Sequence, residues 1–245
     1  MGHCLFLRKG EVHTAPVTGV LASSLTVGST VKLMEGGTAV EYLVVNQGIP
    51  SNSSLYDTSC DGTWLLRKDC HSKMAWNSNA NANTYASSSI NTWLNGEFFN
   101  SLGAIEQTTI NQVKIPYCVG AGNWTINSGA NGLSVKSFLL CGVEVGFFIS
   151  SSNFYPNDGS KLDFFEEGRS EDLKRISQYN GEDAIWMLRS PCPEADNYNA
   201  VHCVLNTGSA GMNYNTKSLN AIRPALILPG NALFDKTTML LKGVK

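Results

Sequence analysis

The sequence predicts an α+β fold with one main domain, because short strand-like runs outnumber helical stretches and long polar loops separate them. The chain has 245 residues, of which 42% are hydrophobic, so it can bury a sizeable core. Only Ser87 to Leu102 shows the apolar spacing of an amphipathic helix over several turns. Loops longer than about 15 residues are uncommon in compact domains and are often functional. Several such loops therefore indicate a scaffold whose surface matters.

The N-terminal third predicts a hairpin followed by a single strand. The runs Val31 to Met34 and Tyr42 to Val45 are rich in strand-forming residues and flank Gly36-Gly37, which is typical of a tight hairpin turn. Thr63 to Lys68 predicts the next strand. The expected surface loops, rich in Asn, Ser and Gly or Ala, are residues 46–63 and 71–86.

The predicted helix begins near Ser87 to Ser89, whose hydroxyls suit an N-cap. Gly96 interrupts its apolar stripe, so we expect the helix to kink or end there. Ala104 to Gln112 predicts a second short helix, and Phe164 to Ser177 a third, charged one. The apolar stripe of the first helix consists of Ile90, Trp93, Leu94 and Phe98.

The remaining apolar runs predict strands, and the Gly- and Asn-rich residues 118–132 predict a loop. Pro224 places the last strand at a sheet edge or a bulge. The expected strands are Val113 to Pro116, Ser137 to Cys141, Glu144 to Phe148, Ala184 to Arg189, Ala200 to Leu205 and Ala221 to Leu228. For Ser137 to Cys141 with Glu144 to Phe148, a strand followed by the start of a helix is the alternative.

The chain divides into an arm, a main domain and a tail. Residues 1–27 contain a short β run, Cys4 to Leu7, and a linker-like stretch broken by Pro16 and Gly19. They are expected to be an attachment segment, with an ordinary N-terminal strand as the alternative. Residues 28–235 form the main domain, and residues 236–245 the tail.

Composition and charge exclude several function classes. The net charge is −2 and no basic stripe is present, which argues against a nucleic-acid partner. No run reaches 18 apolar residues, so we expect no membrane insertion. Met1 to Val12 lacks the pattern of a signal peptide, so a protein acting outside the cell would leave it by lysis or within a particle.

The cysteines are dispersed and odd in number, with no C-x-x-C pair, which argues against a disulfide framework and a zinc ribbon. We expect buried thiols in a reducing compartment. Pairing of Cys60 with Cys70, or of Cys192 with Cys203, stays open at this point. The seven cysteines are Cys4, Cys60, Cys70, Cys118, Cys141, Cys192 and Cys203.

The most informative segment runs from Trp186 to Leu228. Two apolar, strand-like blocks, one with Arg189 and one with Arg223, bracket a long segment rich in Asn, Tyr, Ser and Gly. A charged side chain inside an apolar strand is costly unless it is paired. Both arginines are therefore expected to hold the segment ends by bonding backbone carbonyls or a carboxylate. A rigid frame around a polar segment indicates binding rather than catalysis.

Six phrases together resemble a family found in tailed phages, prophages and gut Firmicutes. Its members carry a C-terminal C-type-lectin fold of the formylglycine-generating-enzyme type, and several are targets of diversity-generating retroelements. The resemblance covers residues 28–235 and implies a C-type-lectin-like fold with short twisted strands, one or two helices and long loops. Met187 and Ala221 depart from the usual pattern. The phrases are Tyr42 to Gly48, Gly62 to Lys68, Ser89 to Asn95, Gln112 to Tyr117, Trp186 to Pro191 and Ile222 to Leu226.

In that family the segment between the two blocks is the variable region, where mutation of adenines turns Asn codons into Tyr, Ser, Asp, His and Gly codons. These residue types fill residues 192–220 here, and Tyr, Asn and Ser also suit binding surfaces. An ordinary turn-rich polar loop is the alternative. The resemblance implies a ligand-binding set framed by Trp186, Arg189 and Arg223. Its members are Asp196, Asn197, Tyr198, Asn199, His202, Asn206, Ser209, Asn213, Tyr214 and Asn215.

No motif favours catalysis. Formylglycine-generating enzymes use a cysteine pair, but Cys192 and Cys203 lie in the suspected variable segment, where a catalytic residue makes little sense. No G-x-S-x-G elbow accompanies the four histidines. We expect no cofactor; Pro156 to Gly159 with Asp163 could supply oxygen ligands to a structural calcium ion, and a turn is the simpler interpretation.

We therefore expect a non-enzymatic, ligand-binding protein of a phage or prophage tail, made in the bacterial cytoplasm and carried on the virion. Its expected partners are a bacterial cell-surface protein or glycan, other tail proteins and further copies of itself, since avidity would multiply weak contacts. The alternatives are an enzyme of the formylglycine-generating-enzyme type and a purely structural virion protein.

Overall fold

The Gly36-Gly37 turn joins two strands of a four-stranded antiparallel sheet, as the sequence predicts. Both glycines have positive φ, 53° and 82°, which glycine adopts without steric cost. The computed structural model that shows this describes residues 19–245 except 52, 79–81, 148–154 and 193–197. The strand order is β16-β4-β3-β2. These strands are β2 (Thr30–Glu35), β3 (Thr38–Gln47), β4 (Thr63–Arg67) and β16 (Ala225–Leu228).

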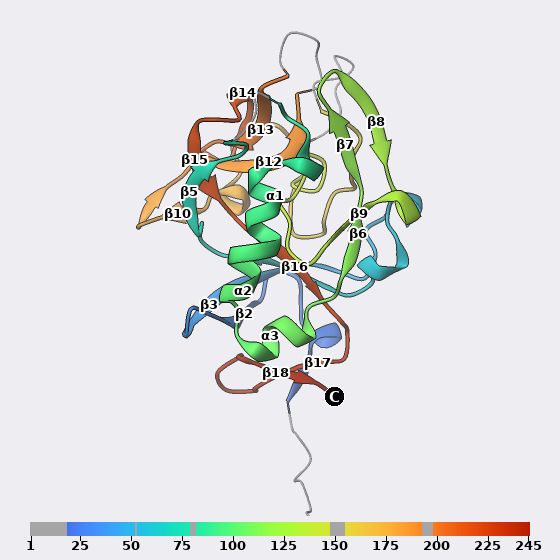
Figure 1. Cartoon of the computed structure of the whole chain (residues 1–245). Coiled ribbons are helices and arrows are strands. Elements are labelled where there is room, and N and C mark those ends of the chain that lie inside the picture. The colour runs from blue at the N-terminus through green and yellow to red at the C-terminus, as the bar shows by residue number, and fades with distance from the viewer. Residues whose placement is uncertain (1–18, 52, 79–81, 148–154, 193–197) are drawn as a thin grey trace, which may run out of the picture.

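A five-stranded sheet contains most of the segment that the sequence singles out. Its order is β14-β13-β12-β15-β5, and only the β12–β15 pair is parallel (Figure 1). Trp186 of β12 is paired with Ala221 of β15, so the two blocks that bracket the polar segment lie side by side. The strands are β5 (Ser72–Ala75), β12 (Trp186–Pro191), β13 (Ala200–Val204), β14 (Ala210–Asn215) and β15 (Leu219–Ile222).

Smaller sheets complete the β structure. β17 lies between β1 and β18, so part of the segment expected as a tail forms a strand. Three two-stranded sheets pair β6 with β9, β7 with β8, and β10 with β11. The bounds are β1 (Val20–Leu21), β6 (Val113–Ile115), β7 (Tyr117–Gly120), β8 (Asn123–Asn127), β9 (Leu133–Val135), β10 (Gln178–Tyr179), β11 (Glu182–Asp183), β17 (Ala232–Phe234) and β18 (Leu241–Val244).

The expected first helix forms and runs past Gly96. Ser88 caps it by accepting a hydrogen bond from the Asn91 amide, at 3.2 Å. α1 (Ser89–Trp93), a π-helical segment η5 (Leu94–Phe98) and α2 (Phe99–Ser101) follow without a break, and α3 (Ala104–Thr109) comes next. Single 3-10 turns are η1 (Ala22–Ser24), η2 (Ser53–Leu55), η3 (Thr58–Cys60), η4 (Tyr85–Ser87), η6 (Gly129–Asn131) and η7 (Leu173–Arg175).

One hydrophobic core joins the helix to both large sheets. Ile90, Leu94 and Phe98 are buried in it, as the apolar stripe predicts. Trp64 of β4 packs edge-on against Phe138, with ring centroids 5.6 Å apart. Within the described residues, no helix is long and apolar enough to cross a membrane.

The expected α+β, C-type-lectin-like fold is wrong. The chain is 38% strand and 17% helical, with one helix of 13 residues, which makes the fold predominantly β. The physical reason lies in the short polar segments, because residues 71–86 and 118–132, expected as loops, contribute β5, β7 and β8. Their backbones pair with neighbouring strands although their side chains show little apolar alternation. In the opposite sense, Ser137 to Cys141 is buried but forms only an isolated bridge, and residues 144–147 lie in or next to a turn.

A substitution at Gly62, just before β4, tests how closely β4 approaches β16. A Cβ at this position would lie 2.3 Å from the Leu228 carbonyl oxygen and 2.8 Å from a side-chain carbon of Ile227, so Gly62→Ala should lower the free energy of unfolding by at least about 2 kcal/mol. Gly96 has open space at its Cβ, so Gly96→Ala should raise stability by about 0.5–1 kcal/mol. Urea unfolding of both variants checks this, and equal effects would contradict the tight β4–β16 contact.

Candidate functional site

β12 forms the buried base of the candidate site. All six of its residues are buried, including Trp186 and Arg189. The Trp186 indole nitrogen donates to the Arg175 carbonyl at 2.9 Å, which fixes the ring. The guanidinium of Arg223 lies over the same ring, 5.0 Å from its centroid. The three framing residues thus belong to the interior. They can affect a binding surface only by supporting the backbone beneath it.

Arg189 is fully buried and fully hydrogen-bonded. Its two terminal nitrogens donate to the two carboxylate oxygens of Glu144, both at 2.6 Å, in a bidentate ion pair. Further bonds reach the carbonyls of Pro116, Leu139 and Asp158 at 3.0, 2.8 and 3.1 Å. These five bonds use all the donors of a guanidinium. Arg189 therefore ties β12 to the junction of β6 and β7 and to the irregular segments that contain Leu139 and Asp158.

Asp158 lies beside this ion pair and is also fully buried. Ser190 donates to its carboxylate, 3.1 Å from each oxygen, and accepts from the Gly142 amide at 2.9 Å. Burial raises the pKa of Asp158 to about 6, although the charge of Arg189 opposes the shift. A carboxyl group that titrates near neutral pH thus sits inside the support of the site.

Asn83 joins three segments at one end of the five-stranded sheet. Its amide nitrogen lies 2.7 Å from the carbonyls of both Cys192 and Ala200, at the end of β12 and the start of β13. Its side-chain oxygen accepts from the Ala121 amide, also at 2.7 Å, in the turn between β7 and β8. Asn83 is 0% exposed. This one side chain therefore fixes the β7–β8 turn against the β12–β13 strands.

Exposed aromatic and amide side chains gather above Asn83. We call this region the apical surface; it consists of Gly122, Trp124, Tyr198, Asn199 and Asn215. Tyr198 is 44% exposed and Trp124 40%. A Cβ on Gly122 would lie 2.6 Å from the Tyr198 ring, so the ring rests on the β7–β8 turn. The Asn199 carbonyl accepts from the Thr216 amide at 2.7 Å, which places Asn199 beside Asn215.

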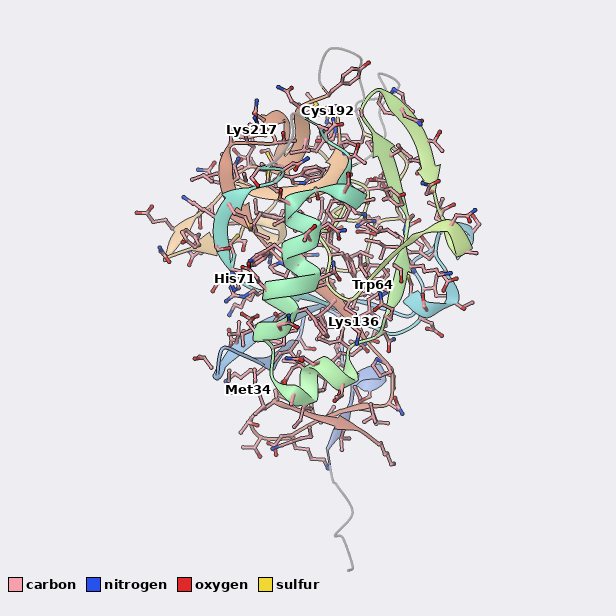
Figure 2. All side chains as sticks on the ribbon, viewed as in Figure 1. Met34, Trp64, His71, Lys136, Cys192 and Lys217 are labelled. Atoms are coloured by element: carbon pink, nitrogen blue, oxygen red, sulfur yellow. The ribbon has the colours of Figure 1, made fainter. Side chains whose placement is uncertain are left out.

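The apical surface lies at the upper end of the molecule. Figure 2 shows Cys192 and Lys217, which neighbour it in sequence, at that end, with Met34 toward the opposite end. Tyr214 of β14 pairs with Val201 and is half-buried, so it supports the surface from below. Asp196 and Asn197 lie in residues 193–197, outside the described residues. The side chain of Asn213 is also outside them.

The other predicted site residues do not share this surface. His202 is 1% exposed, with its ring stacked on Tyr155 at a centroid distance of 4.1 Å and its Nε2 3.6 Å from the Cys192 sulfur. Asn206 and Ser209 belong to the β13–β14 turn at the far end of β13. That turn lies against Asp172 and Arg169, since the Ala210 amide donates to the Arg169 carbonyl. The predicted set is thus divided between two ends of one hairpin.

Metal and thiol chemistry find little support in the described part of the chain. It contains no group of three or more His, Cys, Asp or Glu side chains placed to hold a metal ion. Of the residues considered above for calcium, Asp158 is buried and accepts from Ser190, whereas Asp163 is exposed. The six described cysteines are buried, and no disulfide joins Cys60 to Cys70 or Cys192 to Cys203.

A family match decides what the chain is related to. Residues 61–230 match the model of a domain of unknown function, DUF6273. The chain belongs to the DUF6273 family. No curated protein and no solved structure matches it. Nothing in the DUF6273 match links the chain to phage proteins, to diversity-generating retroelements or to C-type lectins.

The DUF6273 region runs from just before β4 to just after β16. It contains Asn83, the Arg189–Glu144 ion pair and the whole apical surface. It leaves out β2 and β3, although β3 is paired with β4 along its length. The folded unit of this DUF6273 protein is therefore larger than the matched region.

Asn83 should be the most sensitive polar side chain at the apical end. Asn83→Ala would remove the hydrogen bonds to the Ala121 amide and to the Cys192 and Ala200 carbonyls, of which the Ala200 carbonyl keeps the Cys192 amide as a donor, so we expect a loss of about 1–3 kcal/mol in the free energy of unfolding. Asn100→Ala is the control, because Asn100 is exposed on α2 and should change stability by less than about 0.5 kcal/mol. Equal stabilities of the two variants in urea unfolding would contradict the role of Asn83.

Asp158 should make stability depend on pH. Its pKa in the folded protein, about 6, lies above the usual 3.8, so the folded state holds a proton at pH 5 that the unfolded chain releases. This group therefore stabilises the fold below about pH 4 and loses that contribution as the pH rises through 6. Relative to Asp158→Asn, the wild type should gain about 1 kcal/mol between pH 7 and pH 5. Parallel pH profiles of the two proteins in urea unfolding would refute this titration.

Proposed function

We propose that the chain is a ligand-binding protein that presents the apical surface to a bacterial cell-surface protein or glycan. The observation that carries the proposal is Tyr198, an exposed aromatic ring seated on a turn whose backbone Asn83 fixes. Rigid aromatic anchors lose little conformational entropy on binding, and they supply much of the affinity of protein interfaces. Asn199 and Asn215 beside the ring add hydrogen-bonding groups that suit either a polar peptide or a sugar.

The proposed setting is the tail of a phage or prophage, where the protein would act as a receptor-binding component. The support for this setting is the sequence resemblance of the two blocks around Arg189 and Arg223. Several copies on one particle would multiply a weak contact at each apical surface. We accordingly propose further copies of the chain and other tail proteins as partners.

Tyr198→Ala tests the proposal in a binding assay with labelled protein and a panel of intact gut Firmicutes cells. Loss of an exposed anchor should weaken binding to a responsive strain at least tenfold, about 1.4 kcal/mol, while the melting temperature stays nearly unchanged. Ile105→Ala is the matched control, because Ile105 is also 44% exposed but lies on α3. It should bind as the wild type does.

Treatment of the cells identifies the class of receptor. Protease treatment should abolish binding if the receptor is a protein, and periodate oxidation should do so if it is a glycan. If no strain binds the wild type above background, or if Tyr198→Ala binds as well as Ile105→Ala, the apical surface is not the binding site.

A further inference from the structure

Three arginines are almost fully buried, and they differ in how their charge is compensated. Arg189 has the bidentate partner Glu144, and Arg175 has Asp172 at 3.6 Å. Arg223 is 1% exposed and forms no ion pair with any described residue. Its nearest compensation is the face of Trp186 and two carbonyl oxygens. A buried cation without a carboxylate is costly, so a missing acidic partner calls for a physical reason.

The hydrogen bonds of Arg223 leave one amino group unused. Its Nε donates to the Arg67 carbonyl at 2.9 Å, and its Nη2 to the Lys68 carbonyl at 3.0 Å. Nη1 has no hydrogen-bond partner among the described residues. Burial lowers the pKa of Arg223 to about 10, so the group is still charged at neutral pH. A charged amino group with two free hydrogens is a strong donor for an anion.

Arg223 also lines a pocket of about 470 Å³. Lys68 and Lys174 line the same pocket, together with Asp69 and Asp183. Lys68 and Lys174 are each paired with a glutamate, Glu41 and Glu166, at 2.7 and 2.5 Å. Among the cations that line the pocket, Arg223 is therefore the one that forms no ion pair with a described residue.

Apolar side chains form the rest of the pocket wall. Phe164, Leu173 and Ile176 line it, and Leu173 is 85% exposed. A large apolar side chain with that exposure gains free energy when a ligand covers it. Leu173 and Ile176 also line the adjoining pocket of about 430 Å³ beneath the β13–β14 turn. An apolar wall next to an unpaired guanidinium fits a ligand that is itself apolar at one end and anionic at the other.

We propose that this pocket binds an organic carboxylate that carries an apolar group. The carboxylate accepts hydrogen bonds from Nη1 of Arg223, and the apolar group lies against Leu173 and Ile176. Nη1 exposes less than 1 Å², so binding includes a small shift of the pocket wall. The C-terminus of a peptide and a free organic acid share this chemistry. The site is separate from the apical surface and does not depend on the function proposed for that surface.

Titration of the full chain with N-acetyl-leucine, followed by two-dimensional amide NMR at pH 7, tests the site. Saturable shifts are expected for the amides of residues around Arg223 and Leu173. N-acetyl-leucinamide has the same apolar group without the charge and should bind at least tenfold more weakly. Two further titrations distinguish the two sources, one with a tripeptide that has a free C-terminal leucine and one with hexanoate. Tighter binding of the tripeptide identifies a peptide C-terminus as the ligand, and tighter binding of hexanoate identifies a free organic acid.

Variants keep the test independent of folding. Arg223→Met should abolish binding but removes structural hydrogen bonds. Lys174→Gln alters only an exposed side chain and should weaken N-acetyl-leucine binding about two- to fivefold. Lys217→Gln, on the turn between β14 and β15 and outside both pockets, should change nothing. If the acid and the amide bind equally, or if no carboxylate gives saturable shifts, the proposal is overturned.

Discussion

The bidentate pair of Arg189 and Glu144 holds β12 against segments of the chain that have little regular structure. A buried guanidinium and carboxylate cost several kcal/mol each to desolvate, and the cost is met only when every donor and acceptor is engaged. Arg189 meets this condition by bonding three carbonyls besides Glu144. The Tyr56 hydroxyl and the Cys141 amide donate further hydrogen bonds to the two carboxylate oxygens of Glu144. Described residues of irregular structure, such as Leu139, Cys141 and Asp158, can therefore be buried because their backbone polar groups bond to this one pair.

The same constraint explains why the candidate surface lies where it does. β12 has no exposed residue, so it cannot contact a ligand, but it sets the position of β13 and of the β7–β8 turn through Asn83. The buried strand and Asn83 hold the backbone of the surface in place, and the exposed side chains of Trp124 and Tyr198 project outward from it. A binding surface of this kind can change its side chains with little effect on the support, because its backbone contacts lie beneath it.

Sequence patterns predicted the parts of the fold in which local chemistry decides the conformation. Gly36-Gly37 marks the β2–β3 hairpin because both positions have positive φ, and Ser88 with the stripe Ile90, Leu94 and Phe98 marks the helix. The β7–β8 hairpin was missed because its strands show little apolar alternation, although Gly122, with φ of 80°, occupies a position typical of a hairpin turn. Ser137 to Cys141 was mistaken for a strand because an apolar run reports burial and not pairing.

For each buried contact of the site, the sequence predicted only one of the two partners. Arg189 and Arg223 stand out as charges within apolar runs. Nothing in the sequence near Glu144 or Asp158 marks these two residues as neighbours of Arg189, because they are distant from it along the chain. Asn83 follows a run of Asn, Ala and Ser residues that reads as surface, and composition does not tell which Asn side chain turns inward. Such contacts depend on tertiary packing and leave no periodic trace in the sequence.

The pairing of Trp186 with Ala221 has a consequence for how the chain can tolerate change. The two strands that flank the polar segment are parallel neighbours, one strand spacing of about 4.8 Å apart, and β13 and β14 extend the same sheet on the other side of β12. The ladder between β12 and β15 sets this spacing, which does not depend on the number of residues in the β13–β14 turn. Insertions at the exposed turn around Thr207 would therefore lengthen a loop without moving its base, which makes this turn a natural position for grafting a foreign peptide.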